Sequence, residues 1–278
     1  MLPYTVTGHR RAPSPGIRTL QTELGHSKLH HLSMALSPFS FVSVSAALGE
    51  DFMAKSMGFR NTAGPEKHQA VAARVQADRA GFLNCRFKGY QDTVYAPTHQ
   101  QFYKCCVISG TVDFIFGDAA AMFQNCLIYV RKPMENRQNI VTARGRTDKQ
   151  ENTGIVLQNC KIMPDKDLEP VKSQFKTYLG RPWKEFSRTI VMESTTEDLI
   201  HPDGWTTWQG DFALKTLYYA EYNNKGPGAK KTDKRVKWSG YKLIDKQEAM
   251  KYTVGPFLKG NAWLRAKGVP VCFGISEN

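Results

Sequence analysis

The sequence predicts an all-β protein, a right-handed parallel β-helix in which each turn of chain forms one rung. One observation is a six-residue pattern with cysteine at its fourth position, and it occurs four times: FLNCRF (82–87), FYKCCV (102–107), FQNCLI (123–128) and LQNCKI (157–162). A second is spacing, because Cys85, Cys106 and Cys126 recur at a nearly constant interval that suits one rung with short strands. A third is that the middle of the chain lacks long amphipathic helix patterns.

Short strand-like segments, rich in β-branched and aromatic residues, recur in the predicted rungs and end at Gly, Asp, Asn or Pro. They are FIF (114–116), CLIYV (126–130), IVTA (140–143), GIVLQ (154–158), RTIVME (188–193) and TLYYAEY (216–222). The step from Cys126 to Cys160 is clearly longer than the earlier ones, which predicts a rung with a long loop at RKPMENRQN (131–139). Short helical segments are expected near KQEAMKY (246–252), at the C-terminal end.

The cysteines are expected to stack as a ladder inside the solenoid. Neighbouring side chains on a strand point to opposite faces, so only one of Cys105 and Cys106 can join that ladder. A disulfide between Cys126 and Cys160 is the open alternative, since these two residues belong to adjacent rungs.

Composition limits the classes of partner. A formal net charge of +13 and a pI of about 9.5 favour polyanions, whether nucleic acid, acidic polysaccharide or an anionic membrane face. No run of about 18 apolar residues is present, so no membrane span is predicted. Residues 1–40 lack the repeat register and are expected to form a divergent, disordered leader, and AKKTDKRVKW (229–238) is expected to be a solvated surface loop.

Two aspartates, Asp92 and Asp113, lie among aromatic and β-branched residues, where a carboxylate is costly to bury. Their separation in the sequence equals the step from Cys85 to Cys106, so they are expected at equivalent places on successive rungs. Parallel strands lie about 4.8 Å apart. When two carboxyl groups lie that close, the pKa of one rises and that group stays protonated, while the other stays ionised. The protonated group can then act as an acid and the ionised one as a nucleophile.

Amide and guanidinium groups are expected beside these acids. A step one position longer, taken back from Gln91, leads to Gln69, so two side-chain amides should stack next to the two acids and could donate to an oxyanion. Arg181, in TYLGRPWKEF (177–186), could hold the attacking carboxylate ionised, with Trp183 on the same side of an extended strand. Taken singly, each aspartate also fits a turn and each glutamine a structural ladder.

Four segments in order resemble the signatures of the plant-type pectinesterases, or pectin methylesterases: HQAVAARV (68–75), GYQDTVY (89–95), GTVDFIFG (110–117) and LGRPW (179–183). The resemblance runs from about residue 41 to near the C-terminus. It implies a catalytic domain over 41–278 that hydrolyses the C6 methyl esters of homogalacturonan to pectate and methanol, with no metal and no organic cofactor.

The resemblance also implies a role for each matched residue. Asp113 would be the nucleophile that forms a covalent acyl intermediate, and Asp92 the acid and then the base. Gln91 would stabilise the oxyanion and Gln69 would assist it. Arg181 would bind Asp113 and the sugar, and Trp183 would form a stacking wall.

Partners and location follow from the same resemblance. Pectin is the expected substrate, a proteinaceous pectinesterase inhibitor is a candidate partner, and no nucleic-acid or membrane partner is expected. The protein is expected to be a monomer, secreted to the cell wall. Exposed aromatic residues could stack on sugar rings; the candidates are Tyr95, Phe114, Trp183, Trp205 and Trp208.

Several departures from the family pattern leave alternatives open. The usual first rungs have no counterpart before the matched region, Ala73 replaces a common leucine, and Asp118 replaces a common asparagine. A catalytically weak or inactive β-helix that only binds pectin or another polyanion is therefore the alternative. Pectate lyases and polygalacturonases share the solenoid, but their calcium-ligand, histidine and Arg-x-Lys motifs are not found.

Overall fold

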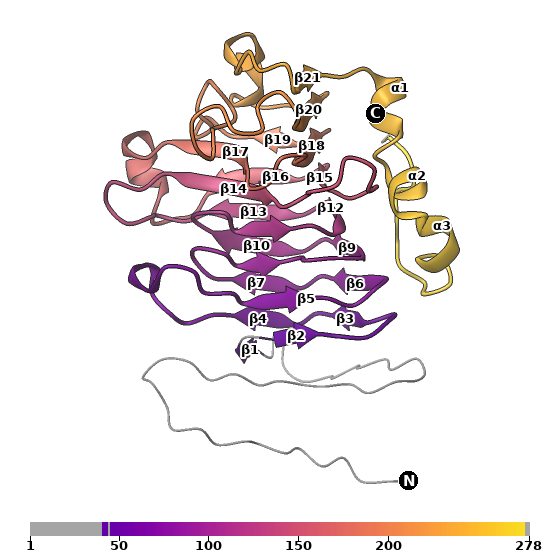
Figure 1. Ribbon diagram of the computed structural model, residues 1–278. Helices are drawn as coiled ribbons and strands as arrows, with labels where there is room; N and C mark the ends of the chain where they lie inside the picture. The colour runs from indigo at the N-terminus through magenta and orange to yellow at the C-terminus, as the bar shows by residue number, and fades with distance from the viewer. Residues whose placement is uncertain (1–40, 44, 276–278) are drawn as a thin grey trace.

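The computed structural model describes residues 41–43 and 45–275 as a parallel β-helix followed by short helices (Figure 1). Neighbouring strands in each sheet belong to successive rungs and pair in parallel, so the predicted fold class is confirmed. The predicted leader, residues 1–40, lies outside the described residues, and the domain boundary at residue 41 stays a prediction. Within the described ranges, no helix is long and apolar enough to cross a membrane.

Three sheets run along the solenoid. The seven-stranded sheet contains β1 (Phe41–Ser43), β4 (Gly58–Arg60), β7 (Arg86–Lys88), β10 (Val107–Gly110), β13 (Leu127–Val130), β16 (Lys161–Pro164) and β19 (Thr195–Thr196). The six-stranded sheet contains β2 (Ser45–Ala47), β5 (Ala73–Val75), β8 (Val94–Tyr95), β11 (Ile115–Gly117), β14 (Asn139–Arg144) and β17 (Thr177–Pro182). The eight-stranded sheet contains β3 (Met53–Lys55), β6 (Ala80–Leu83), β9 (Gln100–Lys104), β12 (Ala120–Gln124), β15 (Gly154–Gln158), β18 (Arg188–Met192), β20 (Tyr218–Tyr222) and β21 (Tyr241–Leu243).

The six-residue cysteine pattern is a corner between two of these sheets. The residue just before the buried cysteine has a positive φ in each repeat: 52° at Asn84, 53° at Cys105, 57° at Asn125 and 51° at Asn159. This left-handed conformation turns the chain from the eight-stranded into the seven-stranded sheet. Asparagine tolerates it better than most residues, which explains its recurrence at this position.

The cysteine ladder forms as predicted, with Cys85, Cys106, Cys126 and Cys160 buried and Cys105 exposed. All these thiols are free, so the alternative of a Cys126–Cys160 disulfide is not realised. Each buried thiol donates to backbone carbonyls, as Cys160 Sγ does to the oxygens of Phe123 (3.3 Å) and Gln158 (3.4 Å). Ser194 continues the ladder in the next rung, a member that a search for cysteine does not find.

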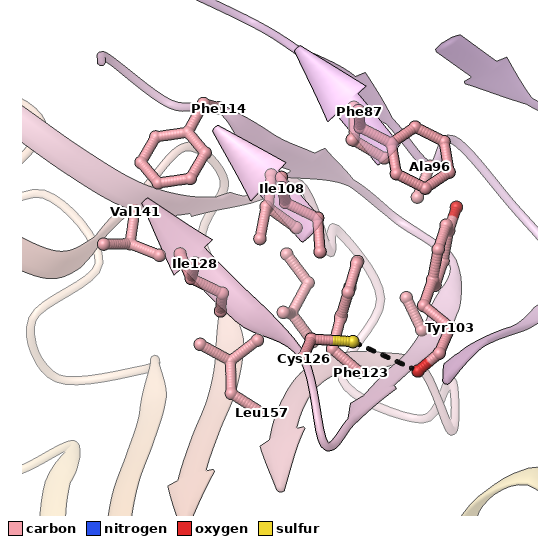
Figure 2. Close-up of a cluster of buried hydrophobic side chains, with 14 of the residues drawn as sticks. Phe87, Ala96, Tyr103, Ile108, Phe114, Phe123, Cys126, Ile128, Val141 and Leu157 are labelled. Atoms are coloured by element: carbon pink, nitrogen blue, oxygen red, sulfur yellow. Dashed lines mark hydrogen bonds between the residues drawn. The ribbon is translucent and has the colours of Figure 1, made fainter. Parts of the chain in front are cut away.

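Aromatic rings fill the interior beside this ladder (Figure 2). Tyr103 stacks between Phe82 and Phe123 of the adjacent rungs, with ring centroids 4.9 and 4.3 Å away. Figure 2 also shows the bond from the Cys126 thiol to the Tyr103 carbonyl, at 3.5 Å. Stacking of like rings in register adds to the apolar burial that holds successive rungs together.

The C-terminal helices are α1 (Lys246–Met250), α2 (Val254–Leu258) and α3 (Gly260–Trp263), and the first confirms the helix predicted near 246–252. They lie along the eight-stranded sheet instead of closing its end (Figure 1), and their apolar residues pack on Phe102, Met122 and Val156. Lys267 then reaches the first rungs, where its Nζ lies 2.7 Å from Asp51 Oδ1. The C-terminal segment therefore spans most of the stack.

One surface prediction is wrong. Within the segment 229–238, predicted to be a solvated loop, Arg235 is only 1% exposed. Its guanidinium donates twice to Glu221, at 2.8 and 3.1 Å, and the Glu221 carboxylate also accepts from Trp205 and Tyr241. The segment is basic in sequence, but the buried Glu221 carboxylate on β20 needs a cation as partner, and Arg235 is therefore buried beside it.

We expect Arg235→Leu to lower the free energy of unfolding by about 3–5 kcal/mol, because it leaves the Glu221 carboxylate buried without its cation. Chemical denaturation measures the change. The matched control is Lys234→Gln, which removes an adjacent exposed charge and is expected to change stability by less than about 0.5 kcal/mol. Equal stability of the two variants would contradict the importance of this ion pair.

Candidate active site

The two aspartates occupy equivalent corners of adjacent rungs, as their spacing in the sequence predicts. Strand β11 pairs with β8 through Ile115 with Val94 and Phe116 with Tyr95, and the same step carried toward the N-terminus aligns Asp113 with Asp92. Both aspartates have a positive φ, 63° at Asp92 and 50° at Asp113. Non-glycine residues in the left-handed conformation are typical of turns and of functional sites. Each of these aspartates forms a corner of the chain and also presents a carboxyl group.

The two glutamines also stack as predicted. Gln69 lies just before β5 and Gln91 just before β8, and the two residues form a parallel β-bridge between adjacent rungs. Gln69 is exposed and Gln91 half-buried, and neither side-chain amide has a hydrogen-bond partner in the part of the chain that the structure describes. Both amides are therefore available to a ligand.

Arg181 binds Asp113 through two parallel hydrogen bonds, Nε to Oδ1 at 2.9 Å and Nη2 to Oδ2 at 2.5 Å. Asp113 is 5% exposed, so this charge-assisted pair lies mostly out of water. Strand β14 separates β11 from β17, and the residue beside Arg181 in that strand is Ala143. Its small side chain leaves room for the guanidinium to reach across the strand.

The electrostatics of the two acids differ. Burial, together with the neighbouring charge of Asp113, raises the pKa of Asp92 to about 7, and Arg181 only partly opposes the rise. Burial also raises the pKa of Asp113, but the hydrogen bonds and the charge of Arg181 oppose that rise directly. Asp92 has no such bonded cation among the described residues. The arrangement can therefore hold one proton on Asp92 while Asp113 remains an anion.

An aromatic row borders the acids on the same face. Tyr95 stacks on Phe116 with centroids 4.6 Å apart, and Phe116 meets Trp183 edge to face at 6.1 Å. Trp208 is 37% exposed, and the Arg181 guanidinium lies 4.3 Å from its ring centroid. Of the predicted aromatic candidates, Tyr95, Trp183 and Trp208 are thus at the site.

The other two candidates belong to the core. Phe114 is fully buried and Trp205 is 1% exposed, stacked on Tyr219 at 4.3 Å. Phe114 lies between the corner at Asp113 and the first residue of β11, and both Phe114 and Ile115 are buried. Within β11, alternation then brings Phe116 outward after the inward Ile115. Strict alternation along GTVDFIFG would place Phe114 and Phe116 on the same face, so the sequence pattern alone does not identify Phe116 as a residue of the site.

Gly145 is a second residue that sequence reasoning missed. A Cβ at this position would lie 2.7 Å from Cε3 of the Trp183 ring, closer than packed atoms approach. Glycine therefore lets the indole lie flat against the backbone after β14. The segment TARGRTD contains this glycine, but only the folded chain shows what packs on it.

Asp118 is paired rather than free. Its Oδ1 lies 2.6 Å from Nη2 of Arg144, which is fully buried and also donates to the Gly117 carbonyl at 2.5 Å. Burial lowers the pKa of Arg144 to about 9, and the Asp118 charge opposes the fall. The negative charge that departs from the family pattern is thus balanced by Arg144, the last residue of β14. Ala73, the other departure, is a buried residue of β5.

Within residues 45–275, no group of three or more His, Cys, Asp or Glu side chains could hold a metal ion. The cationic and polar groups at the site are instead Arg181 and the two glutamines. This set is suited to stabilising negative charge on an oxygen atom without an ion.

Comparison with known proteins gives one family. The family model described as Pectinesterase matches residues 30–261. A probable pectinesterase/pectinesterase inhibitor 13 of Arabidopsis thaliana is 64% identical over 232 residues, and pectinesterase 1 of Citrus sinensis is 53% identical over 238 residues. The alignments cover 83% and 85% of this chain, but only 38% and 41% of those relatives. The chain thus spans about two fifths of the length of the relatives it matches.

A solved structure agrees with the sequence matches. The chain superposes on pectin methylesterase from carrot with a TM-score of 0.84 and 47% identity, over 86% of this chain and 79% of that one. A pectin methylesterase from Aspergillus niger superposes with a TM-score of 0.65 and 30% identity, over 81% and 73% of the two chains. With the family match over most of its length and these relatives, the chain belongs to the pectinesterase family.

Proposed function

We propose that this protein hydrolyses the C6 methyl esters of homogalacturonan, releasing methanol and leaving free carboxylates on pectin. The observation that carries the proposal is the pairing of a buried Asp113, held by two hydrogen bonds from Arg181, with an Asp92 whose pKa is raised to about 7. An ionised carboxylate beside a protonated one is the combination that nucleophilic ester cleavage requires at neutral pH.

In the first half of the proposed reaction, a carboxylate oxygen of Asp113 attacks the ester carbonyl carbon. The carbonyl oxygen becomes an oxyanion, which accepts hydrogen bonds from the amide groups of Gln91 and Gln69. The C–O bond to the methoxy group then breaks, and Asp92 gives its proton to the leaving oxygen. Methanol leaves, and the uronate is joined to Asp113 as an acyl intermediate.

In the second half, Asp92 is an anion and takes a proton from a water molecule. The oxygen of that water attacks the acyl carbon, the bond to Asp113 breaks, and the uronic acid that forms gives its remaining proton to solvent and leaves as a pectate carboxylate. Asp113 returns as a carboxylate and Asp92 again holds a proton, so the cycle closes. Arg181 stabilises Asp113 in both the attacking and the departing form.

The aromatic row is proposed to orient the polysaccharide. Faces of Trp183 and of the Tyr95–Phe116 pair are the right shape for pyranose rings, and the positive charge of the chain favours a partly de-esterified, acidic polymer. A secreted, cell-wall location and recognition by a proteinaceous pectinesterase inhibitor belong to the same proposal, since the relatives include proteins described as pectinesterase/pectinesterase inhibitor.

The test is methanol release from highly esterified pectin, with EDTA present, beside measurements of viscosity and of new reducing ends. The esterase proposal predicts methanol without loss of viscosity, because the backbone of the polymer stays intact. Falling viscosity or new reducing ends without methanol would instead indicate a lyase or polygalacturonase. Binding of pectin with no methanol would leave the protein as a polyanion-binding β-helix and overturn the proposal.

A further inference from the structure

A buried arginine lies close to the aromatic row and takes no part in the proposed chemistry. Arg146 comes two residues after the end of β14 and is 3% exposed. Among the described residues its guanidinium forms no ion pair, and Nε, Nη1 and Nη2 each donate to a backbone carbonyl instead. Burial, together with the charge of Arg188, lowers the pKa of Arg146, so the folded protein holds this cation at a cost.

The three carbonyls belong to two different loops. Nε donates to the Glu151 carbonyl at 3.0 Å and Nη2 donates to the Lys149 carbonyl, both in the loop between β14 and β15. Nη1 donates to the Phe186 carbonyl at 3.2 Å, in the loop between β17 and β18. A guanidinium is planar and presents its donors in fixed directions, so this one side chain holds the two loops in a defined relation.

The loop between β17 and β18 also carries Trp183, which borders the acids. Its backbone pairs with the chain that continues β14, because the Lys184 N–H donates to the Arg144 carbonyl at 3.2 Å and the Phe186 N–H to the Arg146 carbonyl at 3.1 Å. Arg146 thus bonds both backbone groups of Phe186, one through its own carbonyl and the other through its side chain. The loop that carries the indole is therefore fixed mainly by Arg146.

We propose that Arg146 is a positioning residue for Trp183, which sets where the indole stands to meet a sugar ring. The indole lies against the backbone of Gly145, directly before Arg146, so a shift of this segment moves the surface on which the ring rests. The inference rests on the proposed function and adds a residue that acts on substrate binding through another one. Arg146 itself is too deeply buried to contact a polysaccharide.

The expected effect is on binding and not on the chemical step. A stacked aromatic ring contributes roughly a 2- to 10-fold change in affinity. Arg146→Gln removes the bonds to both loops but leaves the pair of Asp113 and Arg181 in place. The variant is therefore expected to raise the KM for pectin in methanol release by roughly 2- to 10-fold, with kcat nearly unchanged.

A double-mutant cycle tests whether Arg146 acts through the indole. The four proteins are the wild type, Arg146→Gln, Trp183→Ala and the variant with both changes, and the measurement is kcat and KM on highly esterified pectin. Because the indole is absent from Trp183→Ala, adding Arg146→Gln to it is expected to raise KM no further. Increases in KM that multiply in the double variant, or a wild-type KM in Arg146→Gln, would overturn the inference.

Arg146→Lys separates placement from charge. Lysine keeps the positive charge, but its single nitrogen cannot reproduce the directions in which the guanidinium bonds carbonyls of both loops. KM is expected to stay raised, as in Arg146→Gln. A return to the wild-type KM would show that charge alone is required and would overturn the positioning role. If Arg146→Gln does not fold, the same two outcomes for Arg146→Lys decide the question.

Arg79→Gln is the matched control for a loss of stability. Arg79 lies between β5 and β6, near the N-terminal end of the stack, and pairs there with the carboxylates of Glu50, Asp51 and Asp78. This variant is expected to lower the melting temperature while the KM of the wild type is kept. An equal rise of KM in Arg79→Gln and Arg146→Gln would mean that lost stability explains both, against the inference.

Failure of the proposed function is distinguishable from failure of the inference. If the wild type releases no methanol from pectin, the esterase proposal fails by itself, and the position of Trp183 is then followed without substrate. Hydroxyl-radical footprinting with mass spectrometry measures how fast the indole is oxidised. Faster oxidation of Trp183 in Arg146→Gln than in the wild type and in Arg79→Gln would support the positioning role. Equal rates in the three proteins would overturn it.

Discussion

Replacing Asp113 by asparagine is expected to lower the rate of methanol release from pectin by at least about 1,000-fold. The amide has nearly the same shape as the carboxylate, but it is not a nucleophile and cannot form the acyl intermediate. The rate of methanol release at saturating pectin measures the effect. The matched control is Asp233→Asn, the same substitution at an exposed residue of the 3-10 helix Ala229–Lys234, which is expected to keep the wild-type rate.

The fold should survive this substitution, so the loss of rate can be assigned to chemistry. Burial raises the pKa of Asp113, which means that its ionised form is held at a cost in the folded state, and Arg181 offsets that cost. A neutral amide has neither the cost of burying an ionised carboxylate nor the compensating attraction to Arg181. The melting temperature is therefore expected to change little. A rate within about tenfold of wild type, in a folded Asp113→Asn variant, would rule out Asp113 as the nucleophile.

The fold was predictable because its repeat is short and its corners are chemically distinctive. Asparagine before a buried cysteine marks the left-handed corner, and the same corner recurs from one rung to the next. The corner that follows these four repeats was missed because Glu193 and Ser194 replace asparagine and cysteine. Their backbone and side-chain roles are the same, with φ of 54° at Glu193 and hydroxyl bonds from Ser194 to carbonyls. The rungs share conformation and bonding more than residue type.

The site was predictable where it depends on register. The step between the first two ladder cysteines aligns Asp92 with Asp113 before any coordinates are known, and a step one position longer aligns Gln69 with Gln91. The contact between Arg181 and Asp113 depends instead on two strands separated by a third, β14. Spacing cannot reveal it. The chemistry of a buried carboxylate suggested an arginine, with Arg181 as the candidate, and the family resemblance assigned it to Asp113. The two bonds between their side chains confirm the contact.

Other parts depend on contacts between distant segments, which no local pattern encodes. Arg235 was assigned to a solvated loop because its neighbours are basic, but Glu221 on β20 draws it into the interior. A pocket beside the acids joins a loop after β13 to a segment before β17. The sequence shows that both segments are rich in charge and amide groups, while only the stacking of rungs shows that they face one space.

Asp92→Asn is expected to lower methanol release by about 100- to 10,000-fold, the usual contribution of a positioned general acid and base. In the wild type, the same group should set the upper limb of the pH profile of kcat/KM. The acyl step needs a proton on Asp92, whose pKa is raised to about 7 by burial and by the Asp113 charge. The rate constant should therefore fall as the pH rises through about 7.

The raised pKa of Asp92 also predicts that Asp92→Asn, although less active, is more stable than the wild type at high pH. Between about pH 4 and pH 7 the folded protein holds a proton on Asp92 that the unfolded chain, with the ordinary value of 3.8, has released. The free energy of unfolding of the wild type therefore decreases as the pH rises through this window, and the cost is complete above about pH 7. Asparagine does not titrate, so the variant does not bear the cost of burying an ionised carboxylate. At about pH 8 Asp92→Asn should be more stable than wild type by roughly 2–4 kcal/mol, with little difference at about pH 4.

Denaturation of both proteins at these two pH values decides the matter. A gain in stability confined to the higher pH, together with the loss of methanol release, would show that Asp92 is held in a costly environment for its chemistry. An equal difference at both pH values would mean that packing, and not ionisation, separates the two proteins. In that case Asp92 would titrate near its ordinary value, and it could not supply the proton that the departing methanol needs at neutral pH.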